Sequence, residues 1–135
     1  MKPNVLLVVA SLGAIVLMTF HLTVDAFHTR EGVYYPGTIA ILGVWLYGTL
    51  RLGQRRSGNV VMLLGGLFGL VAPYLHLIQT NGLIGGEGVT VTASPFFVWT
   101  HLALGTISAF AVALAIEGLW SLRRRRAPAP RSGAA

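Results

Sequence analysis

Hydrophobic residues dominate four long stretches of the chain, and polar or charged residues collect between them. The stretches cover residues 3–27, 34–52, 59–79 and 94–122. At 1.5 Å per residue, each is long enough to cross roughly 30 Å of hydrocarbon as a helix. The stretch over residues 34–52 does so only if Arg51 extends along its own aliphatic stem to the headgroups. The pattern predicts an all-α fold, a four-helix transmembrane bundle over residues 1–122.

Composition supports this interpretation and leaves little room for other domains. Of the 135 residues, 54% are hydrophobic and 10% are charged, whereas about a quarter are charged in a soluble domain. The four spans and their connections use nearly the whole length, so any chemistry must lie inside the bundle or in its loops. The chain has no cysteine, which excludes disulfides, thiolate metal sites and cysteine nucleophiles. It has no recognisable catalytic motif either, so the sequence gives no reason to predict an enzyme.

The positive charges predict the orientation of the bundle. The N-terminus, the connection after the second span and the C-terminal tail fall on one side of the membrane. On the opposite side, Arg30 is the one basic residue. Because Lys and Arg accumulate in cytoplasmic segments, both termini are predicted to be cytoplasmic, in a bacterial inner membrane. The same bias explains the net charge of +6 without a nucleic-acid partner. The nine cytoplasmic cations are Lys2, Arg51, Arg55, Arg56, Arg123, Arg124, Arg125, Arg126 and Arg131.

Each terminus allows a second interpretation. Residues 123–135 form a basic tail that we expect to be disordered; its arginine run is a stop-transfer signal or a binding site for anionic lipid. At the N-terminus, Lys2, an apolar run over residues 5–20 and Val24-Asp25-Ala26 resemble a cleavable signal peptide. That run exceeds the usual 7–15 residues, so a retained span is the preferred prediction.

Small residues recur at helical spacing in the last two spans. In membranes such ridges allow helix backbones to approach closely. We therefore expect both ridges to face other helices. They consist of Gly65, Gly66 and Gly69 in the third span, and of Gly105, Ala109 and Ala113 in the fourth.

All four histidines are predicted to lie in the outer half of the bundle. His21, Asp25 and His28 share one face of the first helix, because they are spaced i, i+4 and i+7. Counting residues along the spans places His21, His76 and His101 roughly 5–10 Å below the outer boundary. Three helices thus bring an imidazole to a similar depth. Ionisable residues at such depth usually face the bundle interior, a cavity or a partner.

Two interpretations of these histidines stay open. In the first, His21, His76 and His101 bind a transition metal ion or a b-type haem, with Asp25 or His28 as a further metal ligand or as support. In the second, the imidazoles form hydrogen bonds that hold helices together. No HExxH, ExxH or CxxC spacing favours the first.

The stretch Val44-Trp45-Leu46-Tyr47-Gly48-Thr49-Leu50 and the overall layout resemble small, uncharacterised bacterial four-helix membrane proteins. The resemblance implies no function and no site residue. Three hypotheses follow from the residues alone: a membrane protein with a metal or haem site, a cofactor-free accessory subunit of a larger membrane complex, and a proton-coupled exporter. The exporter would work as a homo-oligomer, with Asp25 and His21 titrating. Small multidrug exporters, however, carry an acidic residue deep in the first helix, and residues 5–20 contain none.

Overall fold

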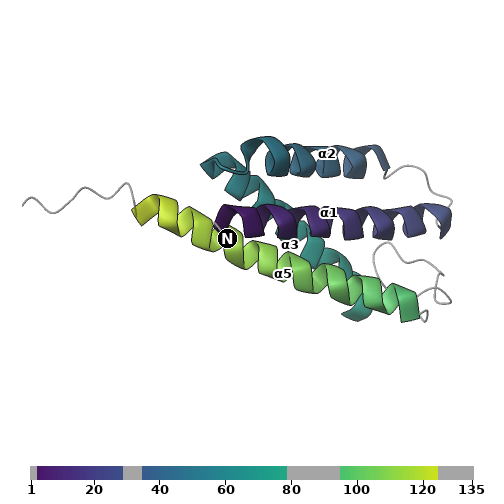
Figure 1. Cartoon of the computed structure of the whole chain (residues 1–135). Coiled ribbons are helices and arrows are strands. Elements are labelled where there is room, and N and C mark those ends of the chain that lie inside the picture. The colour runs from purple at the N-terminus through teal and green to yellow at the C-terminus, as the bar shows by residue number, and fades with distance from the viewer. Residues whose placement is uncertain (1–2, 29–34, 79–94, 125–135) are drawn as a thin grey trace, which may run out of the picture.

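The described part of the chain consists of four helices in a computed structural model (Figure 1). The structure describes residues 3–28, 35–78 and 95–124, and within them the side chains of residues 5–23, 36–74, 96 and 98–124. The prediction of an all-α fold with four helices is confirmed. The largest shift from a predicted span is at the start of α3, at 56 instead of 59. The helices are α1 (Pro3–His28), α2 (Tyr35–Leu52), α3 (Arg56–Ile78) and α5 (Pro95–Arg124).

Local sequence explains where three of the helices start. Pro3 and Pro95 are the first residues of α1 and α5, and Pro36 is the second residue of α2. Proline is favoured in the first helical turn for two reasons. Backbone N–H groups in that turn have no intrahelical acceptor, so the missing N–H of proline costs no hydrogen bond, and the φ of proline is already helical.

A short connection joins α2 to α3. The N–H of Arg55 donates to the carbonyl of Leu52 at 2.7 Å, and the N–H of Asn59 donates to the carbonyl of Arg55 at 3.2 Å. Gly58 lies directly against the Leu52 carbonyl, so that a Cβ at this position would collide with it. A connection this tight makes α2 and α3 antiparallel neighbours.

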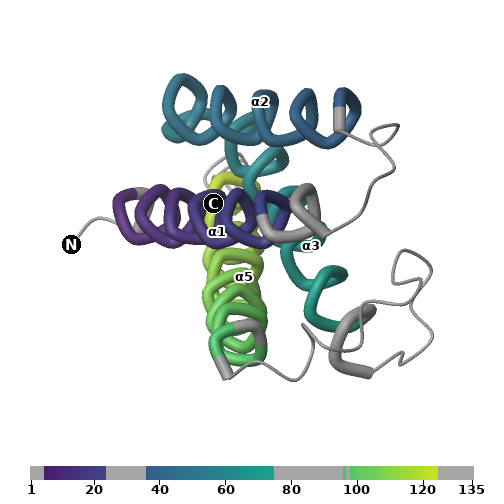
Figure 2. The backbone as a smooth tube through the Cα atoms, turned by 90° about the vertical axis from the view of Figure 1, so that its right-hand side faces the viewer, coloured from purple at the N-terminus to yellow at the C-terminus, as the bar shows by residue number. Residues whose placement is uncertain are grey.

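The helices alternate in direction, and α1 lies between α2 and α5 (Figure 1). The most extensive helix pair is α3 with α5; α1 packs mainly on α5, and α2 mainly on α3. Figure 2 shows that α2 runs alongside α1, whereas α5 crosses it. One end of the bundle, here called the arginine end, carries the start of α1, the α2–α3 connection and the end of α5. The described arginines all lie there: Arg51, Arg55, Arg56, Arg123 and Arg124.

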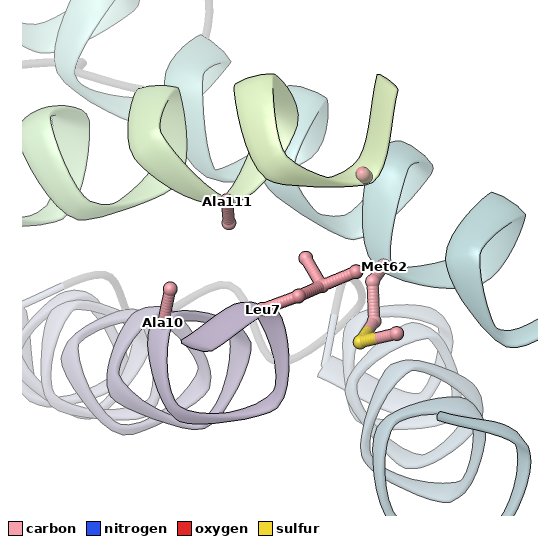
Figure 3. Close-up of a cluster of buried hydrophobic side chains, with 5 residues drawn as sticks. Leu7, Ala10, Met62 and Ala111 are labelled. Atoms are coloured by element: carbon pink, nitrogen blue, oxygen red, sulfur yellow. The ribbon is translucent and has the colours of Figure 1, made fainter. Parts of the chain in front are cut away.

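Two clusters of buried side chains form the core. The cluster nearer the arginine end contains Leu7 and Met62, which face each other between α1 and α3, and Ala10, which faces Ala111 of α5 (Figure 3). The other cluster joins Ala14, Ile15, Met18, Trp45 and Leu104. Small side chains at the α1–α5 contact let these two helices approach closely.

The glycine ridge of α3 faces other helices, as predicted. Gly65 lies against the indole ring of Trp45 in α2, and Gly69 lies against Ser108 of α5. A Cβ added to Gly66 would come within 2.9 Å of Val112 Cγ2. The ridge therefore makes room for larger side chains on two different neighbours.

The prediction for the α5 ridge was wrong at two of its three positions. Gly105 does face α3, because a Cβ there would lie 3.3 Å from Pro73 Cγ. Ala109 and Ala113, however, are exposed. The stripe that α5 buries is rotated from the predicted ridge: Gly69 of α3 lies against Ser108, and Gly66 lies against Val112. This stripe consists of His101, Leu104, Ser108, Ala111 and Ala115.

Large apolar side chains cover the outside of the bundle. Val16 is 53% exposed, Phe20 57% and Leu64 60%, and such continuous apolar surface is rare on soluble proteins. Within the described residues, three helices are long and apolar enough to cross a membrane: α1, α3 and α5. The shortest helix, α2, is not among them. The structure is thus consistent with a membrane protein that has three candidate spans.

Candidate functional site

Two of the predicted site residues meet at the end of the bundle opposite the arginine end. His21 lies in the C-terminal part of α1, and His101 lies near the start of α5. Their ring centroids are 4.6 Å apart, with the ring planes at 79° in an edge-to-face contact. The depth count from the sequence thus placed these two imidazoles correctly relative to each other.

Both rings are removed from the surface. The exposed fraction is 6% for His21 and 1% for His101. One helical turn further into the bundle, Met18 and Leu104 belong to the same core cluster, so the histidines lie at the outer edge of this apolar cluster. Burying an imidazole in such surroundings is costly unless its nitrogens have polar partners. A pair of buried histidines from different helices is therefore either a packing device with hydrogen bonds or a ligand site.

The remaining predicted ligands lie on the same helices or on α3. Asp25 and His28 belong to α1, and His76 belongs to α3, but their side chains lie outside the described residues. Their roles as ligands stay predictions. Among the side chains that are described, no group of three or more histidine, aspartate or glutamate residues is placed to hold a metal ion.

The separation of the rings distinguishes the two proposed cofactors. Nitrogen ligands lie about 2.0–2.1 Å from zinc, which places the ring centroids of two imidazoles on one tetrahedral ion roughly 5 Å apart. Two axial imidazoles on opposite faces of a haem would be roughly 6 Å apart or more, with the macrocycle between them. At 4.6 Å, His21 and His101 contact each other directly. In this arrangement the two rings leave no room for a macrocycle between them.

A second buried polar cluster was not predicted. The indole Nε1–H of Trp45 donates to Ser11 Oγ at 2.8 Å, and Thr49 Oγ1 donates to the carbonyl of Trp45 at 2.8 Å. Because the one hydroxyl hydrogen of Thr49 is used there, Ser11 must be the donor in its 2.8 Å contact with Thr49. Ser11, Thr49 and Trp45 are each no more than 1% exposed. This polar triad (Ser11, Trp45 and Thr49) joins α1 to α2.

In the sequence, the feature that could have predicted the polar triad is the presence of isolated hydroxyl side chains inside apolar spans. Ser11 and Thr49 each interrupt an apolar run, and hydroxyls at membrane depth often bond to a neighbouring helix.

Comparisons with family models, with curated proteins and with solved structures found no match to this chain. Function must therefore be inferred from the geometry of the chain itself.

Proposed function

We propose that this chain is a four-span membrane protein whose outer end binds one transition metal ion through His21 and His101. The observation that carries the proposal is the direct contact between two buried imidazoles from different helices, with centroids 4.6 Å apart. Imidazole is a ligand for zinc, copper, nickel and iron ions. The proposed role is binding.

Packing supports α2 as the fourth span, although α2 is not among the three helices that length and composition mark as candidate spans. The triad ties α2 to α1 through buried hydrogen bonds, and the indole of Trp45 lies against Gly65 of α3. Most exposed side chains of α2 are apolar, such as Val44 at 62% and Ile39 at 66%. If α1 and α3 cross the bilayer, we expect α2, which packs against both of them at the same depth, to cross it too.

The distribution of arginines supports the proposed orientation. The described arginines gather at one end of the bundle, and basic residues near span ends are retained on the cytoplasmic side. At this end the guanidinium carbon of Arg124 lies over the ring of Trp120, 3.6 Å from the ring centroid. Such pairs occur in the aromatic and cationic belts of membrane interfaces. This orientation places the histidine pair near the outer surface of a bacterial inner membrane.

The ligand set we propose combines His21 and His101 with a third group from Asp25, His28 or His76. Asp25 lies one turn beyond His21 on α1, and His28 a further turn along the same face. A carboxylate can bind the ion itself or accept a hydrogen bond from the second nitrogen of a ligating imidazole. Three protein ligands would leave a position for water or a partner's side chain.

Metal analysis of the full chain, purified in detergent without chelators, tests this function. We expect stoichiometric zinc or copper, either retained or bound after addition of Zn²⁺ or Cu²⁺ and dialysis. A Soret band in the absorption spectrum would instead support haem and contradict a shared ion. Absence of both haem and bound Zn²⁺ or Cu²⁺ would contradict any cofactor at this site.

A cofactor-free accessory subunit is the second candidate, favoured by a surface of α5. An open apolar groove of about 490 Å³ is lined by Trp99, Leu102, Ala103, Thr106, Ile107 and Phe110. Aromatic side chains in an exposed groove are suited to packing against another membrane protein. The exporter hypothesis has weaker support, because the ring of His21 is buried against His101. Copurification of a stoichiometric larger subunit with a metal-free chain would favour the accessory role.

A further inference from the structure

A second groove lies between α2 and α3, and Trp45 of the polar triad forms part of its lining. It has a volume of about 360 Å³, within the range of about 300–1,000 Å³ that small-molecule sites occupy. Its lining is entirely apolar: Ala40, Ile41, Val44, Trp45, Val61, Leu64, Gly65 and Phe68.

The chemistry of the lining limits what can occupy this groove. Trp45 carries the one polar side-chain atom in the lining, and its Nε1–H already donates to Ser11. The groove can therefore offer no side-chain hydrogen bond to a ligand. Side chains at its rim are large, with Ile41 47%, Val44 62% and Leu64 60% exposed. Helices in membranes associate through small residues, and the glycines of α3 are already used against Trp45, Ser108 and Val112.

Three arginines lie beyond this groove, toward the arginine end of the bundle. Arg51 is seven residues after Val44 and therefore shares its face of α2, about 10 Å further along the helix. Arg55 and Arg56 lie in the α2–α3 connection and at the start of α3. All three side chains are exposed. An apolar groove with a group of guanidinium ions beyond one of its ends matches a molecule with a long apolar chain and an anionic head.

We propose that the α2–α3 groove binds an anionic phospholipid of the cytoplasmic leaflet. One acyl chain lies along Ile41, Val44 and Leu64, and the phosphate lies among Arg51, Arg55 and Arg56. The cytoplasmic leaflet supplies the anionic headgroups, and each basic residue near the surface strengthens their binding. This inference rests on the proposed membrane insertion and orientation, but not on the histidine pair.

The test compares lipids that share acyl chains and differ in charge. The full chain in detergent is mixed with phosphatidylglycerol or phosphatidylcholine, and bound lipid is counted by native mass spectrometry. We expect retained phosphatidylglycerol on the wild-type protein. The double substitution Arg51→Gln with Arg55→Gln should weaken it on the order of tenfold or more. Arg123→Gln with Arg124→Gln removes the same charge from the C-terminal arginine run and should weaken the binding clearly less than the groove pair does.

A second pair of variants tests the groove itself. Val44→Trp fills the groove and should displace the lipid, whereas Ile39→Trp adds the same ring on another face of α2, where the side chain is 66% exposed, and should not. Equal retention of the two lipids, equal losses from the two arginine pairs, or a dimer that covers the groove without lipid would each overturn the proposal. Fractionation of alkali-washed membranes is measured in parallel: a chain released from the membrane contradicts the insertion, whereas a retained chain without bound lipid contradicts the groove alone.

Discussion

The indole ring of Trp45 in α2 lies directly against Gly65 in α3, where a side chain of any size would collide with it. The same indole donates its N–H to Ser11 in α1. One residue thus fixes α2 to both of its neighbours. Van der Waals packing and a buried hydrogen bond are the two interactions that hold helices together in lipid.

Substitution of Gly65 tests the packing half of this relationship. Gly65→Leu should lower the free energy of unfolding in detergent by about 1–3 kcal/mol, because the leucine displaces the ring of Trp45. Gly43→Leu is the control: a Cβ at Gly43 meets nothing within 4 Å, so the change should be neutral or slightly stabilising, by up to about 1 kcal/mol. Similar losses in both variants would mean that Gly65 is not a contact position.

Substitution of Ser11 tests the hydrogen bond between α1 and Trp45 of α2. Ser11→Ala removes the acceptor for Trp45 and the donor to Thr49, so we expect a loss of stability of about 0.6–2 kcal/mol, measured by thermal or denaturant unfolding. Thr106→Val provides a matched control, since that hydroxyl is exposed and bonds only to the carbonyl of Leu102 in its own helix. If Ser11→Ala proves as mild as Thr106→Val, the polar triad contributes nothing to the attachment of α2.

Topology reporters test the four-span arrangement. A reporter fused after Ala135 should be active only in the cytoplasm, and one inserted at Gly85, outside the described residues, should be active only outside. The physical reason is the nine-to-one distribution of Lys and Arg between the two sides. A reporter placed at Gln54, between α2 and α3, should report the cytoplasm. Finding Gln54 and Gly85 on the same side would contradict the crossing of α3.

How far the sequence predicted the structure depends on the kind of feature. Runs of apolar residues were sufficient to locate four helices. Counting residues along the spans predicted that His21 and His101 lie at a similar depth in the bundle. The rotation of α5 was not predictable in the same way. In a helix that is apolar all round, residues facing lipid and residues facing other helices have similar character, so Ala109 and Ala113 were assigned to the wrong face.

The polar triad escaped prediction for a related reason. A hydroxyl such as that of Ser11 or Thr49 can bond to a carbonyl of its own helix or to another helix, and the sequence does not reveal which. Thr19 and Thr23 illustrate the first outcome, with bonds of 2.8 and 2.7 Å to carbonyls four residues earlier. Only the packing of α2 on α1 distinguishes Ser11 from them.

Metal binding should depend on pH in one direction. An imidazole binds a metal only when its ligating nitrogen is unprotonated, so affinity should be highest above about pH 7 and should fall below about pH 6. With two imidazoles, the fall approaches about tenfold per pH unit for each ring at lower pH. Titration calorimetry with Zn²⁺ at several pH values measures this. An affinity that does not change between pH 5 and pH 8 would exclude histidine ligands.

The most direct measurement of the central claim is the Zn²⁺ or Cu²⁺ affinity of three variants: His21→Ala, His101→Ala and the double variant. If both imidazoles bind one ion, each single substitution should abolish most of the binding, and the double variant should lose little more, because residues that act as a unit are not additive. Asn59→Ala, another buried polar position, 2% exposed and near the arginine end, should bind the ion normally. Unchanged affinity in either single histidine variant would contradict a site shared by His21 and His101.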